Sequence, residues 1–247
     1  MTTDDDPYRE GRVAVASACR VLAMEGLVAD ILGHVSLRVG DGRALVRARR
    51  PSDQGLLLSE PGDVVLVDLD GNPAEDLGDH TLPAELPIHT TVLSRRPDVN
   101  AVVHAHPPEV VAASIASLPL RPIFGAFNIP AMRLAEAGIP TYDYYGLIRN
   151  SRRATEMSDL LADGRVVLLR GHGLTSAGPT LAAAAVTALN VNRLAAMTCA
   201  VARMGATAPL VPEADRQELP DLGAAFHDDA TWRAYLSKLG PAGLSLT

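Results

Sequence analysis

Two histidines placed two positions apart, His104 and His106, carry the strongest chemical signal in this chain. They follow the apolar run Ala101-Val102-Val103, which predicts a short strand that ends at Pro107. Because side chains alternate along a strand, residues two apart point to the same side, so the two imidazoles form a candidate pair of metal ligands. The pair alone would also fit two histidines that are hydrogen-bonded at the entrance of a helix.

A third histidine favours the metal interpretation. His172 lies between Gly171 and Gly173, where glycine lets the backbone turn sharply and bring an imidazole close to other groups. Glu85 adds a carboxylate in the first turn of a helix that we expect over residues 83–95, although the helix dipole alone also favours an acidic residue there. Three neutral imidazoles and one carboxylate suit Zn²⁺, with Mn²⁺, Fe²⁺ and Co²⁺ as competitors.

The elements that must position these residues alternate between strand-like and helical segments, which predicts the α/β class. Several short apolar segments follow one another early in the chain, and this succession favours a mixed sheet over a purely parallel one. We expect helices over residues 8–26, 83–95, 109–117, 179–205 and 225–239, and strands over 35–39, 44–46, 64–69, 101–103 and 166–169. Prolines and acidic residues predict a loose connection over residues 209–222.

Composition predicts a soluble, cytoplasmic, globular protein. The chain has 247 residues, 47% of them hydrophobic, and its net charge of −7 gives no electrostatic footprint for nucleic acid. Cys19 and Cys199 are too few for a disulfide framework, and no apolar run reaches the roughly 18 residues of a membrane span. The first residues are acidic where a secretory leader would be basic. We therefore predict neither a nucleic-acid nor a membrane partner.

Longer motifs make the chain resemble the class II aldolase/adducin family over roughly residues 10–205. They occur in the family's order and read Gly33-His-Val-Ser36, Asp63-Val-Val-Leu-Val-Asp-Leu-Asp-Gly71, Ala84-Glu-Leu-Pro-Ile-His89, Arg96-Pro-Asp-Val-Asn-Ala-Val-Val-His-Ala-His106 and Leu168-Leu-Arg-Gly-His-Gly173. The resemblance implies a single-domain α/β/α sandwich around a mixed, mainly antiparallel sheet. On this basis residues 8–205 form the catalytic domain, and residues 206–247 form a C-terminal extension packed on it or on a neighbouring subunit.

The same resemblance implies roles for the site residues and an assembly. Glu85, His104, His106 and His172 match the family's metal ligands, with the glutamate doubling as the acid/base. His89 matches a further family histidine, and because it follows Glu85 by four residues it shares that helix face. We predict that His89 orients the glutamate without binding the metal. The family also implies a homotetramer with active sites near subunit boundaries.

The chain departs from the family's sugar-phosphate aldolases where those enzymes hold the phosphate. Pro83 and Ala84 stand in place of the two serines before the glutamate, and neither residue has a side-chain donor. His34 replaces the family's asparagine, and Asp53 would repel a phosphate if it faced the pocket. The aldolases' tyrosine acid has no counterpart within residues 122–130. A phosphorylated sugar is therefore not the expected substrate.

These replacements favour the branch of the family that acts on unphosphorylated substrates, which includes decarboxylases of hydroxylated aromatic acids such as dihydroxyphthalate. We predict a carbon–carbon lyase that decarboxylates a small hydroxylated aromatic or unsaturated oxo carboxylic acid in aromatic compound catabolism. His34 joins Glu85 as a candidate catalytic residue. Candidate substrate contacts are Arg170, Phe124 and Ser36.

Other functions stay open on this scaffold. The same site would serve an aldolase of an unphosphorylated hydroxy-oxo acid, a sugar-phosphate aldolase or epimerase, or a non-haem iron oxygenase. A binding protein in the manner of adducin would have no need for all four ligand candidates. The cation that holds a second substrate carboxylate also stays open, because the cluster Arg47, Arg49 and Arg50 competes with Arg170 for that role.

Overall fold

Seven short strands form one sheet in the computed structural model, which describes residues 6–40, 42–221 and 223–246. The strands are β1 (His34–Arg38), β2 (Arg43–Arg47), β3 (Val64–Asp68), β4 (Ala101–Ala105), β5 (Thr141–Tyr142), β6 (Val166–Leu169) and β7 (Gly173–Gly178). Their order across the sheet is β3-β2-β1-β4-β7-β6-β5, and β5 pairs with β6 in parallel whereas the other neighbours are antiparallel. The prediction of a mixed, mainly antiparallel sheet is confirmed.

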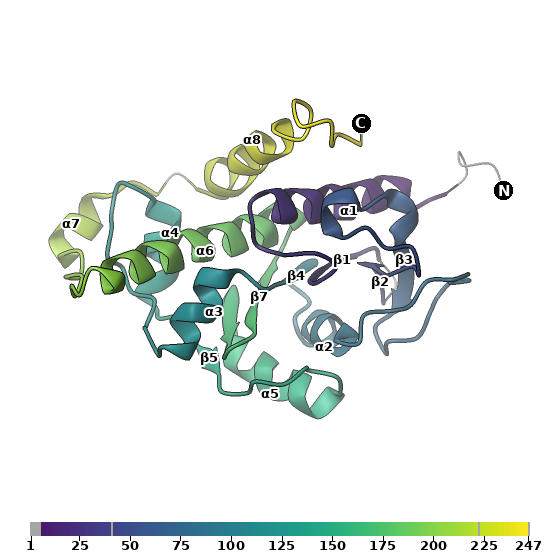
Figure 1. The fold of residues 1–247 in the computed structure, drawn as a ribbon, viewed down its shortest axis with the longest axis horizontal. Helices are drawn as coiled ribbons and strands as arrows, with labels where there is room; N and C mark the ends of the chain where they lie inside the picture. The colour runs from purple at the N-terminus through teal and green to yellow at the C-terminus, as the bar shows by residue number, and fades with distance from the viewer. Residues whose placement is uncertain (1–5, 41, 222, 247) are drawn as a thin grey trace.

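Helices cover both faces of the sheet (Figure 1). One core joins the sheet to α1 (Arg9–Met24), α6 (Leu181–Arg203) and α8 (Thr231–Ser237), and a second core joins it to α2 (Leu86–Arg95) and α5 (Ser151–Leu161). The shorter helical elements are α3 (Pro108–Ile115), α4 (Ile129–Glu136), α7 (Glu213–Glu218), the 3₁₀ turns η1 (Leu56–Leu58) and η2 (Pro61–Asp63), and the π-helical turn η3 (Ala225–Ala230). The predicted α/β/α sandwich is therefore confirmed.

Strand alternation decides which side chains face which core. In β1, Val35 belongs to the core under α1, whereas His34 and Ser36 contact a residue of α2 on the opposite face. In β4, Val103 again belongs to the α1 core, and the next residue, His104, is the Cα partner of His34 in the antiparallel ladder. The sheet thus gathers its histidines on the face that α2 covers.

The long helix α6 belongs to the interior of the fold. Within the described part of the chain it is the one helix long and apolar enough to cross a membrane, but 61% of its apolar window is buried inside the molecule. The hydroxyl of Thr180 caps its first turn by accepting a hydrogen bond from the Ala183 amide at 3.0 Å. A buried, capped helix of this kind is typical of the core of a soluble protein.

The C-terminal residues pack on the same domain. Trp232, Tyr235 and Leu239 are buried in the core that α1 and α6 share. The guanidinium of Arg20 donates to the Leu244 carbonyl at 2.8 Å, which ties this end of the chain to α1. The expected amphipathic segment is divided between η3 and α8, and the expected loose connection contains the short helix α7.

Besides α7 and the 3₁₀ turns η1 and η2, four elements were not expected from the sequence: α4, α5, β5 and β7. The strand β7 reads Gly-Leu-Thr-Ser-Ala-Gly, so its small side chains give neither an apolar run nor a clear alternation. Helix α5 did carry a usable signal, because Asn150 caps it by accepting from the Arg153 amide at 3.0 Å. Strand β5 has only two residues and depends on its pairing with β6.

Candidate metal centre

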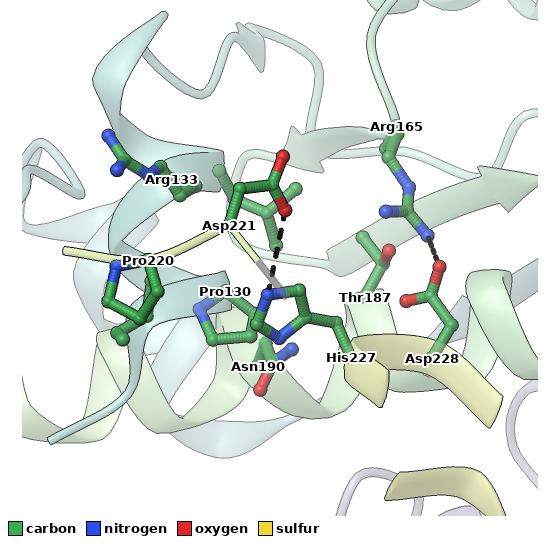
Figure 2. Close-up of a pocket in the computed structure, with 11 residues that line it drawn as sticks. Pro130, Arg133, Arg165, Thr187, Asn190, Pro220, Asp221, His227 and Asp228 are labelled. Atoms are coloured by element: carbon green, nitrogen blue, oxygen red, sulfur yellow. Dashed lines mark hydrogen bonds and ion pairs between the residues drawn. The ribbon is translucent and has the colours of Figure 1, made fainter. Parts of the chain in front are cut away.

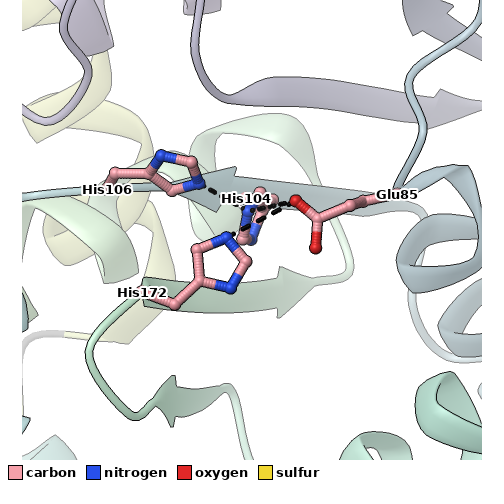
Figure 3. A group of neighbouring side chains, drawn as sticks. All are labelled: Glu85, His104, His106 and His172. Atoms are coloured by element: carbon pink, nitrogen blue, oxygen red, sulfur yellow. Dashed lines mark hydrogen bonds and ion pairs between the residues drawn. The ribbon is translucent and has the colours of Figure 1, made fainter. Parts of the chain in front are cut away.

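One glutamate and three histidines converge where β4 ends and β7 begins (Figure 3): Glu85, His104, His106 and His172. Each residue offers one ligand atom, and these atoms all lie within 4.8 Å of one another. The residues come from three separate segments: the end of β4, the turn between β6 and β7, and the approach to α2. The four residues that the sequence predicts as metal ligands therefore lie close together in the structure.

The pairing of β4 with β7 explains why the three histidines meet. Ala105 near the end of β4 is the partner of Leu174 near the start of β7, so His106 lies beside the turn that carries His172. A Cβ on Gly173 would lie 2.2 Å from the Ala105 carbonyl oxygen, so only glycine allows this close approach. The position of His172 beside the other two histidines thus depends on the missing side chain of Gly173.

Glu85 immediately precedes α2 and occupies its N-cap position. The prediction that it lies within the first helical turn is therefore wrong, because the helix begins at Leu86 with Pro87 in its first turn. The Oε1 atom accepts a hydrogen bond from the Ile148 amide at 2.7 Å. The other oxygen, Oε2, is turned toward the histidines, 3.5 Å from His104 Nε2 and 3.4 Å from His172 Nε2.

The electrostatics favour a carboxylate among neutral imidazoles. Burial would raise the pKa of Glu85, but His104 and His172 hold it well below its usual range. Burial lowers the pKa of His104 against the opposing effect of Glu85. Burial also lowers the pKa of His106 to about 3, with the charges of His104 and His172 acting in the same direction. These groups therefore present free lone pairs near neutral pH.

Unsatisfied ring nitrogens of one histidine show that the cluster could hold a cation. Both ring nitrogens of His172 are buried and lack a hydrogen-bond partner among the described residues, an arrangement that costs free energy unless a ligand completes it. His104 Nδ1 lies 3.4 Å from the Thr175 hydroxyl, a contact that leaves Nε2 for a metal. The residues present therefore fit a divalent cation.

The spacing of the ligand atoms agrees with this reading. His104 Nε2 lies 2.8 Å from His106 Nε2, and the two histidine–glutamate distances are 3.4 and 3.5 Å. Neighbouring ligands of a tetrahedral zinc ion with bonds of ~2.1 Å are roughly 3.4 Å apart. Small side-chain movements would therefore bring all four ligand atoms to bonding distance from a common point.

His34, His89 and Ser36 lie in a buried line next to the cluster. His89 Nε2 is 2.6 Å from His34 Nδ1, and His89 Nδ1 is 2.6 Å from the Ser36 hydroxyl oxygen. The sequence predicts that His89 orients Glu85, but no hydrogen bond joins these two side chains within the described residues. Ser36 is fully buried beneath His89, away from any open surface.

Two candidate substrate contacts have other neighbours. Arg170 Nε lies 2.5 Å from Asp143 Oδ1, and its NH1 donates to the Ser114 carbonyl at 2.7 Å and to the Ser117 hydroxyl at 3.1 Å. Phe124 packs edge-on against a neighbouring phenyl ring with centroids 5.4 Å apart. Neither side chain makes a hydrogen bond, ion pair or ring contact with the four-residue cluster within the described residues.

The basic cluster separates into paired arginines and an unpaired one. Arg47 pairs with Asp53 at 2.5 Å, and Arg50 pairs with Asp63 at 2.7 Å. The half-buried Arg49 makes no side-chain hydrogen bond or ion pair with any residue that the structure describes. The sequence alone does not tell which arginine is unpaired, because the three arginines have the same chemistry and differ only in their neighbours.

The backbone and charge of Arg49 connect it to the metal centre. Its backbone amide and carbonyl both bond to Thr81, at 3.0 and 2.7 Å, four residues before Glu85. The pKa of His106 is lowered mainly by burial, with neighbouring histidine charges and the positive charge of Arg49 adding to the effect. The guanidinium therefore lies within electrostatic reach of the site.

A cavity of about 320 Å³ lies elsewhere, between α4, α6 and residues 220–221 and 227–228 (Figure 2). Arg165 and Asp228 form an ion pair of 3.1 Å on its wall, and His227 lies 3.9 Å from Asp221. Its lining, as far as the structure is described, shares no residue with the metal centre. We assign no chemistry to this cavity.

The fold and the site define a class II aldolase-type protein. Residues 13–199 match the Class II Aldolase and Adducin N-terminal domain, so the chain belongs to this family, whose members depend on a divalent metal. The chain is 50% identical to a 3,4-dihydroxyphthalate decarboxylase of Arthrobacter keyseri, covering 94% of both chains. It is 43% identical to a protein of the same name from Terrabacter sp., covering 94% of this chain and 98% of the relative.

A solved structure supports the fold. The aldolase II superfamily protein from Pseudomonas syringae superimposes with a TM-score of 0.83, covering 98% of this chain and 97% of that one. The two sequences are 22% identical, so this similarity concerns the architecture alone.

Proposed function

We propose that this protein is a metal-dependent decarboxylase of a dihydroxylated aromatic diacid, with 3,4-dihydroxyphthalate as the substrate to test first. The observation that carries the proposal is the cluster of Glu85, His104, His106 and His172 in a chain half identical to a decarboxylase of that name. The four ligand candidates argue against a purely structural role in the manner of adducin.

The absence of phosphate-binding groups in the sequence supports a non-phosphorylated substrate. Pro83 is buried and Ala84 is exposed, and neither side chain can donate a hydrogen bond to a phosphate. Asp53 is occupied by Arg47 and by the Gly55 amide at 2.8 Å. Without a phosphate anchor, binding energy for positioning the substrate must come from carboxylates and the aromatic ring.

We propose that the three histidines and Glu85 hold a divalent cation, and that Zn²⁺ suits this set of ligands best. When bound, the cation supplies a Lewis acid that acidifies a neighbouring ring hydroxyl and withdraws electron density as the C–C bond breaks. The histidines supply neutral ligands because their pKa values are low, as for His106 at about 3. The carboxylate of Glu85 offsets part of the positive charge.

Glu85 is proposed as the acid/base. Its carboxylate takes the proton of the ring hydroxyl next to the departing carboxylate and then returns that proton to the ring carbon. The bond from this carbon to CO₂ breaks, its electron pair restores the aromatic ring, and the product oxygen recovers a proton from water. The hydrogen bond from the Ile148 amide to Oε1 keeps the carboxylate oriented.

Arg49 is proposed as the anchor for the carboxylate that stays on the ring. Its guanidinium makes no hydrogen bond or ion pair with an acidic side chain among the described residues, although its charge helps to lower the pKa of Asp53, whereas Arg47, Arg50 and Arg170 each form an ion pair with an aspartate. A free guanidinium can bind a carboxylate through two parallel hydrogen bonds. We assign Arg170 to the support of the turn that carries His172, because its NH1 donates to the Ser114 carbonyl and the Ser114 hydroxyl accepts from the Gly171 amide.

A homo-oligomer, with a tetramer as its expected form, is part of this proposal. Ile115 and Tyr145 are 57% and 64% exposed and lie over Gly171, one residue before His172. Large apolar side chains exposed together are typical of an interface. A contact between subunits there would cover the edge of the site, and light scattering at micromolar concentration would reveal the mass. We propose a cytoplasmic location, which suits the two free, buried cysteines.

The decisive experiment measures CO₂ release from 3,4-dihydroxyphthalate by protein whose metal content has been determined by elemental analysis. We expect turnover that a chelator abolishes and the expected metal restores. Fuculose-type and ribulose-type phosphates serve as controls and should give little or no cleavage. Efficient cleavage of a sugar phosphate would replace this proposal with an aldolase, and substrate-dependent oxygen consumption would replace it with an oxygenase.

A further inference from the structure

Three polar side chains from two elements form one hydrogen-bonded line that ends at the metal centre. The hydroxyl of Ser36 in β1 lies 2.6 Å from His89 Nδ1, and His89 Nε2 lies 2.6 Å from His34 Nδ1. The exposed fractions are 0% for Ser36, 1% for His89 and 5% for His34. The line is therefore shielded from water except at its His34 end.

The serine hydroxyl fixes the direction of this line. Ser36 is fully buried, and among the described residues His89 Nδ1 is the one hydrogen-bond partner of its hydroxyl oxygen. A buried hydroxyl hydrogen requires an acceptor, so Ser36 donates and His89 Nδ1 accepts. His89 then carries its own proton on Nε2 and donates it to His34 Nδ1. In the opposite direction the hydroxyl hydrogen of Ser36 would have no acceptor.

Both rings are neutral, as this chain of donors requires. The two ring nitrogens that are 2.6 Å apart can share only one proton, so they cannot both belong to imidazolium ions that donate. Burial, reinforced by nearby His104, lowers the pKa of His89 to about 3. Because His89 Nδ1 accepts from Ser36 and His34 Nδ1 accepts from His89, neither ring carries a second proton.

The remaining nitrogen of His34 is available to a ligand. His34 Nε2 has no hydrogen-bond partner among the described residues. It is not one of the fully buried side-chain atoms that lack a partner, so it is accessible. The ring stacks on His104 with centroids 4.9 Å apart, which places it against the metal centre. An accessible nitrogen beside a metal centre is in position to meet a bound substrate.

We propose that Ser36 and His89 lock His34 into the tautomer with its proton on Nε2, so that His34 is a neutral hydrogen-bond donor to an anionic oxygen of the substrate. This inference rests on the proposed function for the identity of that oxygen, which is the carboxylate that leaves as CO₂. His34 is then a catalytic residue that binds and orients the carboxylate, and Ser36 and His89 are positioning residues.

The locked tautomer also implies different catalytic roles for His34 and Glu85. A neutral imidazole that already accepts a hydrogen bond at Nδ1 has no free lone pair at Nε2, so His34 cannot take a proton from the ring hydroxyl. It is equally unable to give up its Nε2 proton at low cost, because the chain behind it would end in a serine alkoxide. The proton that reaches the ring carbon therefore belongs to Glu85.

Nitrogen NMR of zinc-loaded, [¹⁵N]histidine-labelled protein tests the tautomer directly. The spectrum of His34→Gln assigns the His34 signals by difference. We expect a pyridine-type signal for His34 Nδ1 and a pyrrole-type signal for Nε2. The reverse assignment would overturn the inference whatever reaction the protein catalyses, whereas a lack of decarboxylase activity would overturn the proposed function and leave the NMR result intact.

Variants of the positioning residues test its consequence. Ser36→Ala should lower kcat/KM by about 10–100-fold and weaken the Nε2 pyrrole signal at unchanged metal content. Ser36→Thr or Ser36→Cys, which restore a donor, should recover part of the activity. His89→Gln should retain more activity than His89→Phe, because its amide can still donate to His34.

The matched control is Ser176→Ala. Ser176 is also fully buried in the sheet, but its hydroxyl donates to the Ala184 carbonyl at 2.8 Å, on the helix side of β7. We expect a comparable loss of thermal stability with kcat/KM and the His34 signals unchanged. Equal effects of Ser36→Ala and Ser176→Ala on kcat/KM would show that Ser36 serves the fold alone and would overturn the positioning role.

Discussion

The imidazole of His34 is stacked on the imidazole of His104, with ring centroids 4.9 Å apart and 29° between the ring planes. The same two residues are Cα partners in the antiparallel ladder of β1 and β4. A slip of one residue in this ladder would turn one of the two side chains to the opposite face of the sheet and separate it from the other. The register of two central strands therefore sets the spacing between the proposed substrate donor and a proposed metal ligand.

Removal of a ligand should separate metal binding from acid/base chemistry. We expect about one divalent ion per chain in the wild-type protein, and loss of both metal and activity in His104→Ala, because its Nε2 lies at the centre of the cluster. Glu85→Gln should retain part of the metal while activity falls by about 10²–10⁴-fold, because an amide cannot carry the proton. Elemental analysis and CO₂ release measure the two effects.

His80→Ala is the control for these metal measurements. His80 contacts the Leu77 carbonyl at 2.9 Å and does not belong to the cluster. Its metal content should equal that of the wild type. An unchanged metal content in His104→Ala would contradict the assignment of the site.

Substitution of Arg49 should affect diacids selectively. We expect Arg49→Gln to raise KM for 3,4-dihydroxyphthalate by about 10–100-fold, because a charged, two-point contact with the retained carboxylate is lost. The substrate analogue 2,3-dihydroxybenzoate lacks that carboxylate and should bind wild type and variant equally. The measurement is a comparison of steady-state constants for both compounds.

Arg43→Gln provides the matched control for Arg49. Arg43 begins β2, the strand that ends two residues before Arg49, and is exposed. Its steady-state constants should equal those of the wild type for both acids. An equal loss of affinity for the monoacid and the diacid in Arg49→Gln would remove the residue from carboxylate recognition.

The metal-free protein should lose stability as the pH falls below about 6.5. The pKa of His89 is about 3 in the folded chain, against about 6.5 in the unfolded chain, so between these values the unfolded state binds more protons. The stabilisation is complete above pH 6.5 and is lost toward pH 3, at about 1.4 kcal/mol per pH unit for this histidine. Chemical denaturation between pH 4.5 and 7 measures the slope.

His89→Gln identifies the source of that slope. Glutamine does not titrate. The slope of the unfolding free energy against pH should therefore fall by the contribution of about one bound proton in the same range. The comparison requires chelator-treated protein, because a bound cation adds its own pH dependence. Parallel pH profiles of wild type and variant would be inconsistent with a neutral, buried His89.

Gly173→Ala should damage the site through the backbone. The new Cβ would lie 2.2 Å from the Ala105 carbonyl oxygen, so β7 must move away from β4. We expect a loss of about 1–3 kcal/mol in the free energy of unfolding, together with weaker metal binding as His172 shifts from the other histidines. Gly62→Ala, where a Cβ has no atom within 4 Å, should change neither quantity.

Local patterns in the sequence were sufficient to find the three histidine candidates. The spacing of His104 and His106 depends only on strand alternation, and the turn that carries His172 is marked by its own glycines. The family resemblance supplied the remaining member, Glu85, and the sandwich architecture. These predictions succeed because each depends on a short stretch of chain or on the order of motifs.

Relationships between distant segments could not be obtained in the same way. Helical spacing placed His89 on the face of Glu85, but the residues it meets, His34 and Ser36, lie more than 50 positions away on a strand whose register had to be known. The pairing of arginines with aspartates likewise depends on loop conformation. Strand β7 escaped prediction because its glycines and small residues serve close packing and give no hydrophobic pattern.

The hydrogen bond between the Ile148 amide and Glu85 Oε1 gives the site a built-in reporter. The proton on this amide faces the carboxylate directly, so its chemical shift and its exchange with solvent should follow the charge of Glu85 as that group gains or loses a proton. A single backbone resonance can therefore record the protonation state of the proposed acid/base during ligand binding, without a label on the substrate.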